Sequence, residues 1–88
     1  MTWEVRFDRH AVRALSGFDE GVQKRLLAGA LALRQDPLRR RSGADVKRLQ
    51  GQPGVYRLRI GDFRLFDVVA AERRVVVVTD VRHRSHAY

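Results

Sequence analysis

Residues 55–69 constrain the fold more than any other part of the chain. They form two alternating segments, VYRLRI and FRLFDVV, separated by the dipeptide GD. Alternation of apolar and polar side chains with a period of two predicts half-buried β-strands, and a Gly-Asp pair between them predicts a tight two-residue turn. We therefore expect a β-hairpin with one apolar face and one polar face.

The register of this hairpin gathers arginines on its polar face. With a two-residue loop, Arg59 lies opposite Arg64 and Arg57 lies opposite Phe66. Like charges directly opposite one another destabilise paired strands, and a sequence that keeps such a fault is typical of a functional surface. The alternatives are a register shifted by one residue, or an acidic side chain that folds over the arginines, with Asp67, Asp80 and Glu72 as candidates.

The rest of the chain predicts one further strand, two helices and a last strand, over residues 3–7, 9–16, 20–35 and 75–81. Asp8 and Asp19 stand at the expected N-caps of the helices, and Pro37 ends the second helix. Residues 1–88 therefore predict a single α+β domain of order β-α-α-β-β-β. We expect a small twisted antiparallel sheet with the helical hairpin packed on one face, and the first strand at a sheet edge. The segment VKRL is expected to be a short extended piece.

Arginine dominates the charge of the chain. Lysine and arginine together number 18 against 10 acidic residues, for a formal net charge of +8, and only Lys24 and Lys47 are lysines. Because the guanidinium is a permanently charged, planar fork that suits phosphate and stacks on bases, the composition predicts a polyanionic partner, most simply nucleic acid. The alternative is that these arginines merely solvate the surface.

Several classes of function are not expected. The chain has no cysteine, so we expect neither a disulfide scaffold nor a thiolate metal site, and His10, His83 and His86 have no acidic cluster around them in the sequence. No apolar segment follows a basic start, and the longest apolar run, VVVV, is too short to span a bilayer. We therefore expect a cytoplasmic protein that uses no metal or other cofactor.

The segments F...AVRAL..F, RLL.GALAL...P and VKRLQG.PGVYRLRIGDFRLFDV resemble the RelE/ParE toxin superfamily. The valine-rich strand and the arginine-rich segment that ends in tyrosine extend the resemblance over nearly the whole chain. RelE-branch members are bacterial and archaeal toxins that cleave mRNA in the ribosomal A site without a metal, whereas the ParE branch poisons DNA gyrase. The resemblance implies the first activity as the leading interpretation, with gyrase inhibition or a catalytically weak ribosome-binding relative as alternatives.

The candidate catalytic residues combine the hairpin register with this resemblance, and they are Arg57, Arg59, Arg64, Arg82, Tyr88 and His86. The arginines would bind the phosphate and stabilise the phosphorane, while Arg82 would contact phosphate or assist the leaving group and Tyr88 would hold a base. The candidate residues for binding RNA or the ribosome are Arg39, Arg40, Arg41, Lys47, Arg48, Phe66 and Arg84.

The general base is an open point of this assignment. Relatives often carry lysines where this chain has Arg57 and Arg59, and an arginine does not give up its proton near neutral pH. His83 or His86 is then the candidate base or acid, with His86 preferred because it lies two residues from Tyr88. The resemblance also implies an acidic, RelB-like antitoxin that forms a heterodimer or heterotetramer with the chain and inserts a helix or adds a strand.

Overall fold

The computed structural model describes residues 2–35, 45–48 and 55–86 of the chain. The sheet consists of strands β1 (Glu4–Phe7), β2 (Asp45–Arg48), β3 (Val55–Ile60), β4 (Phe63–Ala70) and β5 (Val75–His83). The helices are α1 (Arg9–Ser16) and α2 (Glu20–Leu31), with three short 3₁₀ turns, η1 (Ala32–Arg34), η2 (Ala71–Arg73) and η3 (Arg84–His86). Within these ranges, no helix is long and apolar enough to cross a membrane.

The five strands form one sheet in the order β1-β5-β4-β3-β2. Strands β2 to β5 pair antiparallel with their neighbours, whereas β1 lies at the edge and pairs parallel with β5. The α+β class, the helical hairpin and the edge position of the first strand are confirmed. The sheet is mixed because β1 pairs with the last strand, and the helices and three strands between them form a long connection that permits parallel pairing where a tight turn would not. The extended segment around VKRL is strand β2.

The caps of both helices match the sequence prediction. The backbone N–H of Ala11 donates to Asp8 Oδ1 at 2.8 Å, and that of Val22 donates to Asp19 Oδ1 at 2.9 Å. Each carboxylate satisfies one of the N–H groups that a helix N-terminus leaves without an intrahelical partner. The second helix ends at Leu31 and continues as η1, so the predicted range of 20–35 is nearly filled, while Pro37 lies outside the described residues.

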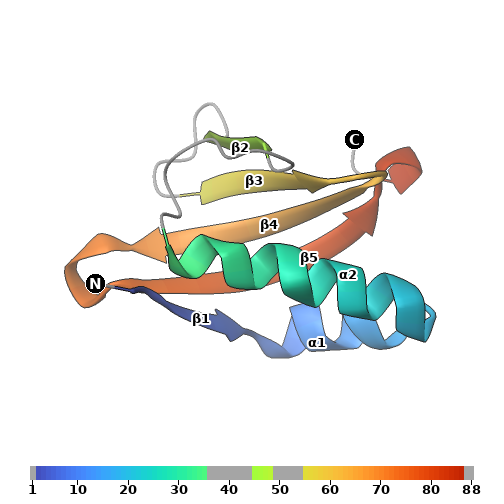
Figure 1. Ribbon diagram of the computed structural model, residues 1–88, viewed down its shortest axis with the longest axis horizontal. Helices are drawn as coiled ribbons and strands as arrows, with labels where there is room; N and C mark the ends of the chain where they lie inside the picture. The colour runs from blue at the N-terminus through green and yellow to red at the C-terminus, as the bar shows by residue number, and fades with distance from the viewer. Residues whose placement is uncertain (1, 36–44, 49–54, 87–88) are drawn as a thin grey trace.

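Helix α2 crosses one face of the sheet and covers the apolar side of the β3–β4 hairpin (Figure 1). The core there contains Leu26, Ala30, Leu58 and Leu65, each at most 1% exposed. Gly29 lets the helix approach closely, because a Cβ at this position would lie 2.5 Å from Cδ1 of Ile60. This packing leaves the opposite face of the hairpin without a described helix over it.

Strand β5 contains one extra residue relative to β4. Asp67 pairs with Val78 but Phe66 pairs with Asp80, so Thr79 is left over as a bulge. The Thr79 hydroxyl donates to the backbone carbonyl of Phe66 at 3.3 Å across this irregularity. Side chains alternate between the two faces, so the extra residue changes the alternation. Val76 and Val78 face the helices before the bulge, and Val81 faces them after it.

Candidate functional site

The face of the sheet opposite α2 carries a concentration of cationic side chains, and we call it the arginine face. It is formed by Arg57, Arg59, Arg64, Phe66 and Arg82. Alternation along the strands puts these residues on the side away from the buried Leu58, Leu65 and Val81. The bulge at Thr79 adds Arg82 to this face, because strict alternation from the buried Val78 would have turned Arg82 towards the helices.

Three arginines lie side by side across three neighbouring strands. Arg59 of β3 is the direct partner of Arg64 of β4, and Arg64 is the direct partner of Arg82 of β5. The register predicted for the hairpin is therefore confirmed. With neighbouring strands about 4.8 Å apart, the row concentrates three positive charges within the span of a single phosphodiester group and its neighbours.

The middle arginine of the row is the most constrained. Arg64 is half-buried, and its Nη1 donates to the backbone carbonyl of Phe63 at 3.2 Å. Its Nε is buried without a hydrogen-bond partner, and within the described ranges neither Arg59 nor Arg64 forms an ion pair. The guanidinium groups of Arg59 and Arg64 thus keep their positive charges without a described acidic partner, and a guanidinium presents five N–H groups in a fixed fork that suits an anion.

Among the side chains that the structure describes, an acidic one pairs with one end of the row. Asp80 Oδ2 accepts from Arg82 Nε at 2.6 Å, so one of the three neutralising acids considered from the sequence does meet the arginines. The other two do not, because Asp67 is buried on the helix-covered face and Glu72 lies in η2 at the other end of β5. The sequence reasoning missed that Asp45 of β2 occupies the position opposite Arg59.

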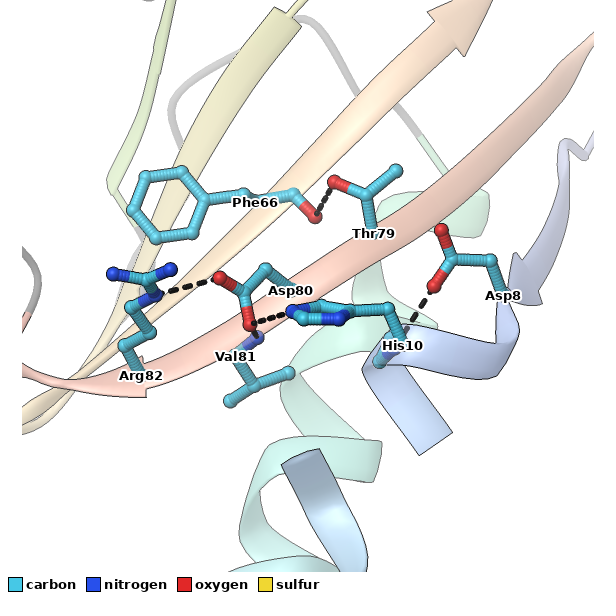
Figure 2. A network of polar contacts seen from close by, with 8 residues as sticks. Asp8, His10, Phe66, Thr79, Asp80, Val81 and Arg82 are labelled. Carbon is cyan, nitrogen blue, oxygen red and sulfur yellow. Dashed lines mark hydrogen bonds and ion pairs between the residues drawn. The ribbon is translucent and has the colours of Figure 1, made fainter. Parts of the chain in front are cut away.

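Asp80 is the centre of a polar network that also reaches helix α1 (Figure 2). Its Oδ1 accepts from the backbone N–H of Val81 at 2.9 Å and lies 3.3 Å from His10 Nε2, while its Oδ2 holds Arg82. The His10 side chain is 66% exposed and that of Asp80 only 18%. His10 and Asp80 are distant in sequence, so no local pattern indicated this pair.

The other histidine candidates are placed differently. His83 pairs with Phe63 on the helix-covered side, with the two rings edge to face at 5.3 Å, and its Nδ1 lies 2.9 Å from Ser85 Oγ. It is therefore not on the arginine face. Arg84 is at the end of the β3–β4 hairpin, where its Nε lies 3.8 Å from Asp62 Oδ1.

Several predicted site residues cannot be placed by their side chains. Tyr88 and the three consecutive arginines at 39–41 lie outside the described residues, as do the side chains of Lys47, Arg48 and His86. The register nevertheless puts Lys47 opposite Arg57, in the row that continues to Phe66. The roles of these predicted residues, from the arginines at 39–41 to Tyr88, stay predictions.

Asp67 is a second unusual carboxyl group, on the opposite side of the sheet. It is fully buried, neither oxygen has a hydrogen-bond partner, and burial raises its pKa to about 7. Desolvation disfavours the charged form of a carboxyl, which explains the direction of the shift. The signal was present in the sequence, because alternation continues the apolar face of Phe63 and Leu65 to position 67.

The chemistry of the described site is that of an anion-binding surface. Three adjacent guanidinium groups can bind a phosphate and stabilise added negative charge on it. Phe66 adds an aromatic ring beside them, on which a base can stack. Among the described residues, no group of three or more histidine, cysteine or acidic residues gathers as a metal site would require.

Known proteins similar to this chain are toxins and toxin–antitoxin complexes. The sequence profile of the family described as "ParE toxin of type II toxin-antitoxin system, parDE" matches residues 5–88. A protein of Methanocaldococcus jannaschii that is named as a toxin, RelE1, is 28% identical over 88 residues, which cover 100% of this chain and 97% of that protein.

Solved structures agree with this relationship. A chain of the RelE–RelB complex of Pyrococcus horikoshii is 28% identical, with a TM-score of 0.81 and coverage of 99% of this chain and 100% of that one. A chain of the toxin–antitoxin complex RelBE2 of Mycobacterium tuberculosis is 27% identical, with a TM-score of 0.79 and coverage of 96% and 100%. Together with the family match along residues 5–88, these relatives show that the chain belongs to the RelE/ParE superfamily and is a toxin of a type II toxin–antitoxin system.

Proposed function

We propose that this toxin is an endoribonuclease that cleaves ribosome-bound mRNA in the A site and thereby stops translation. The observation that carries the proposal is the cross-strand row of Arg59, Arg64 and Arg82 on a sheet face that no described helix covers. Maintaining like charges side by side costs folding stability, so a function that uses them is the simplest reason for their presence. The relatives named RelE agree with this choice.

The proposed reaction is an internal transesterification of RNA. The 2′-hydroxyl oxygen attacks the adjacent phosphorus, a new P–O2′ bond forms, and the P–O5′ bond breaks. The products are a 2′,3′-cyclic phosphate and a 5′-hydroxyl. Phosphate charge increases in the phosphorane, and the arginine row stabilises it there more strongly than in the ground state, which is what accelerates a reaction.

The other predicted residues have supporting roles in this proposal. Arg57 extends the cationic surface beside the row, and Phe66 and Tyr88 hold bases by stacking. Lys47, Arg48, Arg84 and the arginines at 39–41 bind ribosomal RNA through its phosphates. Because ribosomes are the target, the toxin acts in the cytoplasm.

The proposal includes an antitoxin that binds the toxin directly. The structural relatives are components of toxin–antitoxin complexes, and an uncontrolled toxin would arrest its own host. An acidic partner complements the charge of +8. Leu27, Leu31 and Val12 on the two helices are each at least 40% exposed and offer apolar contacts for a partner helix, in a heterodimer or heterotetramer.

Induction of the toxin without its antitoxin tests this function against gyrase inhibition. Mapping of 5′-hydroxyl ends in cellular mRNA after induction should show cuts within translated regions, together with a rapid loss of protein synthesis. The family match to ParE toxins makes gyrase the specific alternative. Intact mRNA with a DNA damage response would favour that alternative, and ribosome binding without any cut would indicate a catalytically weak relative.

A further inference from the structure

The arginine row leaves one requirement of the proposed reaction unmet, namely removal of the proton from the 2′-hydroxyl. Arginine is a poor general base at neutral pH. His83 lies on the other side of the sheet, where its ring contacts Phe63 and its Nδ1 lies near Ser85. His10 is placed differently, because it lies close to Asp80, and Asp80 in turn binds Arg82 of the arginine face.

Asp80 joins His10 to the arginine row through its two carboxylate oxygens. Oδ1 lies 3.3 Å from His10 Nε2, and Oδ2 accepts from Arg82 Nε at 2.6 Å. The imidazole and the guanidinium are therefore separated by a single carboxylate group (Figure 2). A phosphate bound by Arg82 would lie close to the His10 ring.

A shallow pocket of about 340 Å³ lies at this place, at the junction of α1 and β5. His10, Asp80, Arg82 and His83 line it together with the apolar side chains of Ala14, Phe18 and Val81, so His83 is the rival base that an experiment must separate from His10. Its volume is at the lower end of the range for small-ligand sites, and it combines apolar walls with a few polar groups as such sites do. The pocket therefore offers room beside the arginine row for part of a nucleotide.

The contact with Asp80 involves Nε2 of His10, so Nδ1 is the ring nitrogen that can accept a proton from a substrate. Asp80 Oδ1, 3.3 Å from His10 Nε2, favours the tautomer with the hydrogen on Nε2, and a neutral imidazole in that tautomer keeps the lone pair on Nδ1. An acid that orients the imidazole through one nitrogen while the other transfers a proton is a recurring arrangement in enzymes. The high exposure of His10, 66%, leaves its ring accessible to a substrate.

We propose that His10 is the general base of this toxin and that Asp80 is a positioning residue that holds His10 and Arg82 for the same phosphate. The inference rests on the proposed ribonuclease function. The proton of the 2′-hydroxyl moves to His10 Nδ1 as the P–O2′ bond forms. The leaving 5′-oxygen takes a proton from water, and the imidazolium returns its proton to the solvent.

The test is single-turnover cleavage of a defined mRNA on programmed ribosomes, measured against pH. For wild type we expect a rate that rises with pH and then levels as the imidazole loses its proton. His10→Gln should lower the rate about 10²- to 10⁴-fold and remove this rise, whereas binding to the same complex carrying 2′-deoxy mRNA should not change. The rate of His10→Ala should partly recover on addition of imidazole, which a purely structural role would not allow.

Two variants with the same new side chain serve as comparison. Ser16→Gln lies at the exposed C-terminal end of α1, about 240° around the helix from His10, and is expected to cleave like wild type. His83→Gln tests the rival histidine and is expected to keep the pH-dependent rise. Asp80→Asn should reduce the rate less than His10→Gln, because the amide still accepts from Arg82.

The outcomes separate this inference from the proposed function. If Arg64→Ala is inactive while His10→Gln cleaves at the wild-type rate with the same pH profile, the ribonuclease function stands and His10 is not its base. A loss in His83→Gln alone, or a His10→Gln defect confined to binding, also overturns the assignment. If wild type itself leaves the mRNA intact, the proposed function fails and this inference fails with it.

Discussion

Arg64 of β4 lies directly opposite Arg82 of β5, and this pairing depends on the accommodation of Thr79 as a bulge in β5. If Thr79 took a regular place in the ladder, Arg82 would be on the helix-covered face, and Arg59 and Arg64 would have no third arginine beside them. β-Bulges often occur beside functional sites, where they redirect a side chain. Here the bulge brings the arginine of the last strand beside those of the hairpin.

Removal of the middle arginine should abolish activity without unfolding the protein. Arg64→Ala removes the guanidinium between Arg59 and Arg82, and loss of one such group from an anion-stabilising site commonly costs about 10²–10³ in rate. The rate of mRNA cleavage and the growth arrest on induction measure the effect. Arg73→Ala, an exposed arginine in η2, is the control and should remain toxic. Full toxicity of Arg64→Ala would show that the row is not the site.

Deletion of Thr79 should leave the fold and the arginine row in place. Without the extra residue, Val78, Asp80, Val81 and Arg82 alternate regularly, so Val81 stays in the core and Arg82 stays beside Arg64. The loss is the hydroxyl bond to the Phe66 carbonyl, at about 1 kcal/mol, and Thr79→Ala should lose the same amount. Urea unfolding measures both variants, and a deletion variant that unfolds while Thr79→Ala is stable would contradict this register.

Asp67 should make folding stability depend on pH. Burial raises its pKa from 3.8 to about 7, so between these values the folded state binds a proton that the unfolded state has lost. Stability from this group is therefore highest at acidic pH and decreases as the pH rises towards 7, by at most about 1.4 kcal/mol per unit. Asp67→Asn cannot titrate, so its stability relative to wild type should rise by roughly 2 kcal/mol between pH 5 and pH 7.

Urea unfolding at a series of pH values measures this difference for Asp67→Asn. Glu72→Gln also removes a carboxyl group but lies exposed in η2, and it should keep the pH dependence of wild type. If Asp67→Asn and wild type have parallel pH profiles, then Asp67 has an ordinary pKa in the folded protein.

Gly29 should be intolerant of a side chain. In Gly29→Ala the new Cβ would lie 2.5 Å from Ile60 Cδ1 and 2.9 Å from Cγ1, and the overpacking should cost about 1–3 kcal/mol in spite of the better helix propensity of alanine. Ile60→Val in that background removes Cδ1 and should restore part of the loss. Gly21→Ala in the same helix meets nothing closer than 3.5 Å and is the control. Equal stability of the two alanine variants would contradict the packing of α2 on β3.

The sequence predicted the features that depend on local patterns. The GD turn and the alternation of both strands were enough to pair Arg59 with Arg64, and Asp8 and Asp19 marked both helix starts. Tertiary features were not predictable in this way. The bulge at Thr79 arises from pairing with β4, and the meeting of His10 with Asp80 requires α1 to lie beside β5, so neither has a signal in the neighbouring residues.

The most direct test of the proposed activity replaces one 2′-hydroxyl group of the substrate with hydrogen. Ribosomes are programmed with mRNAs that carry a single 2′-deoxynucleotide at each position of the A-site codon in turn, and cleavage by the wild-type toxin is measured. Transesterification on the arginine face predicts that the bond next to the deoxynucleotide at the cleavage position stays intact, while the all-ribose mRNA gives 2′,3′-cyclic phosphate and 5′-hydroxyl ends. Cleavage of that same bond in the deoxy-substituted mRNA, or an uncut all-ribose mRNA, would contradict the account.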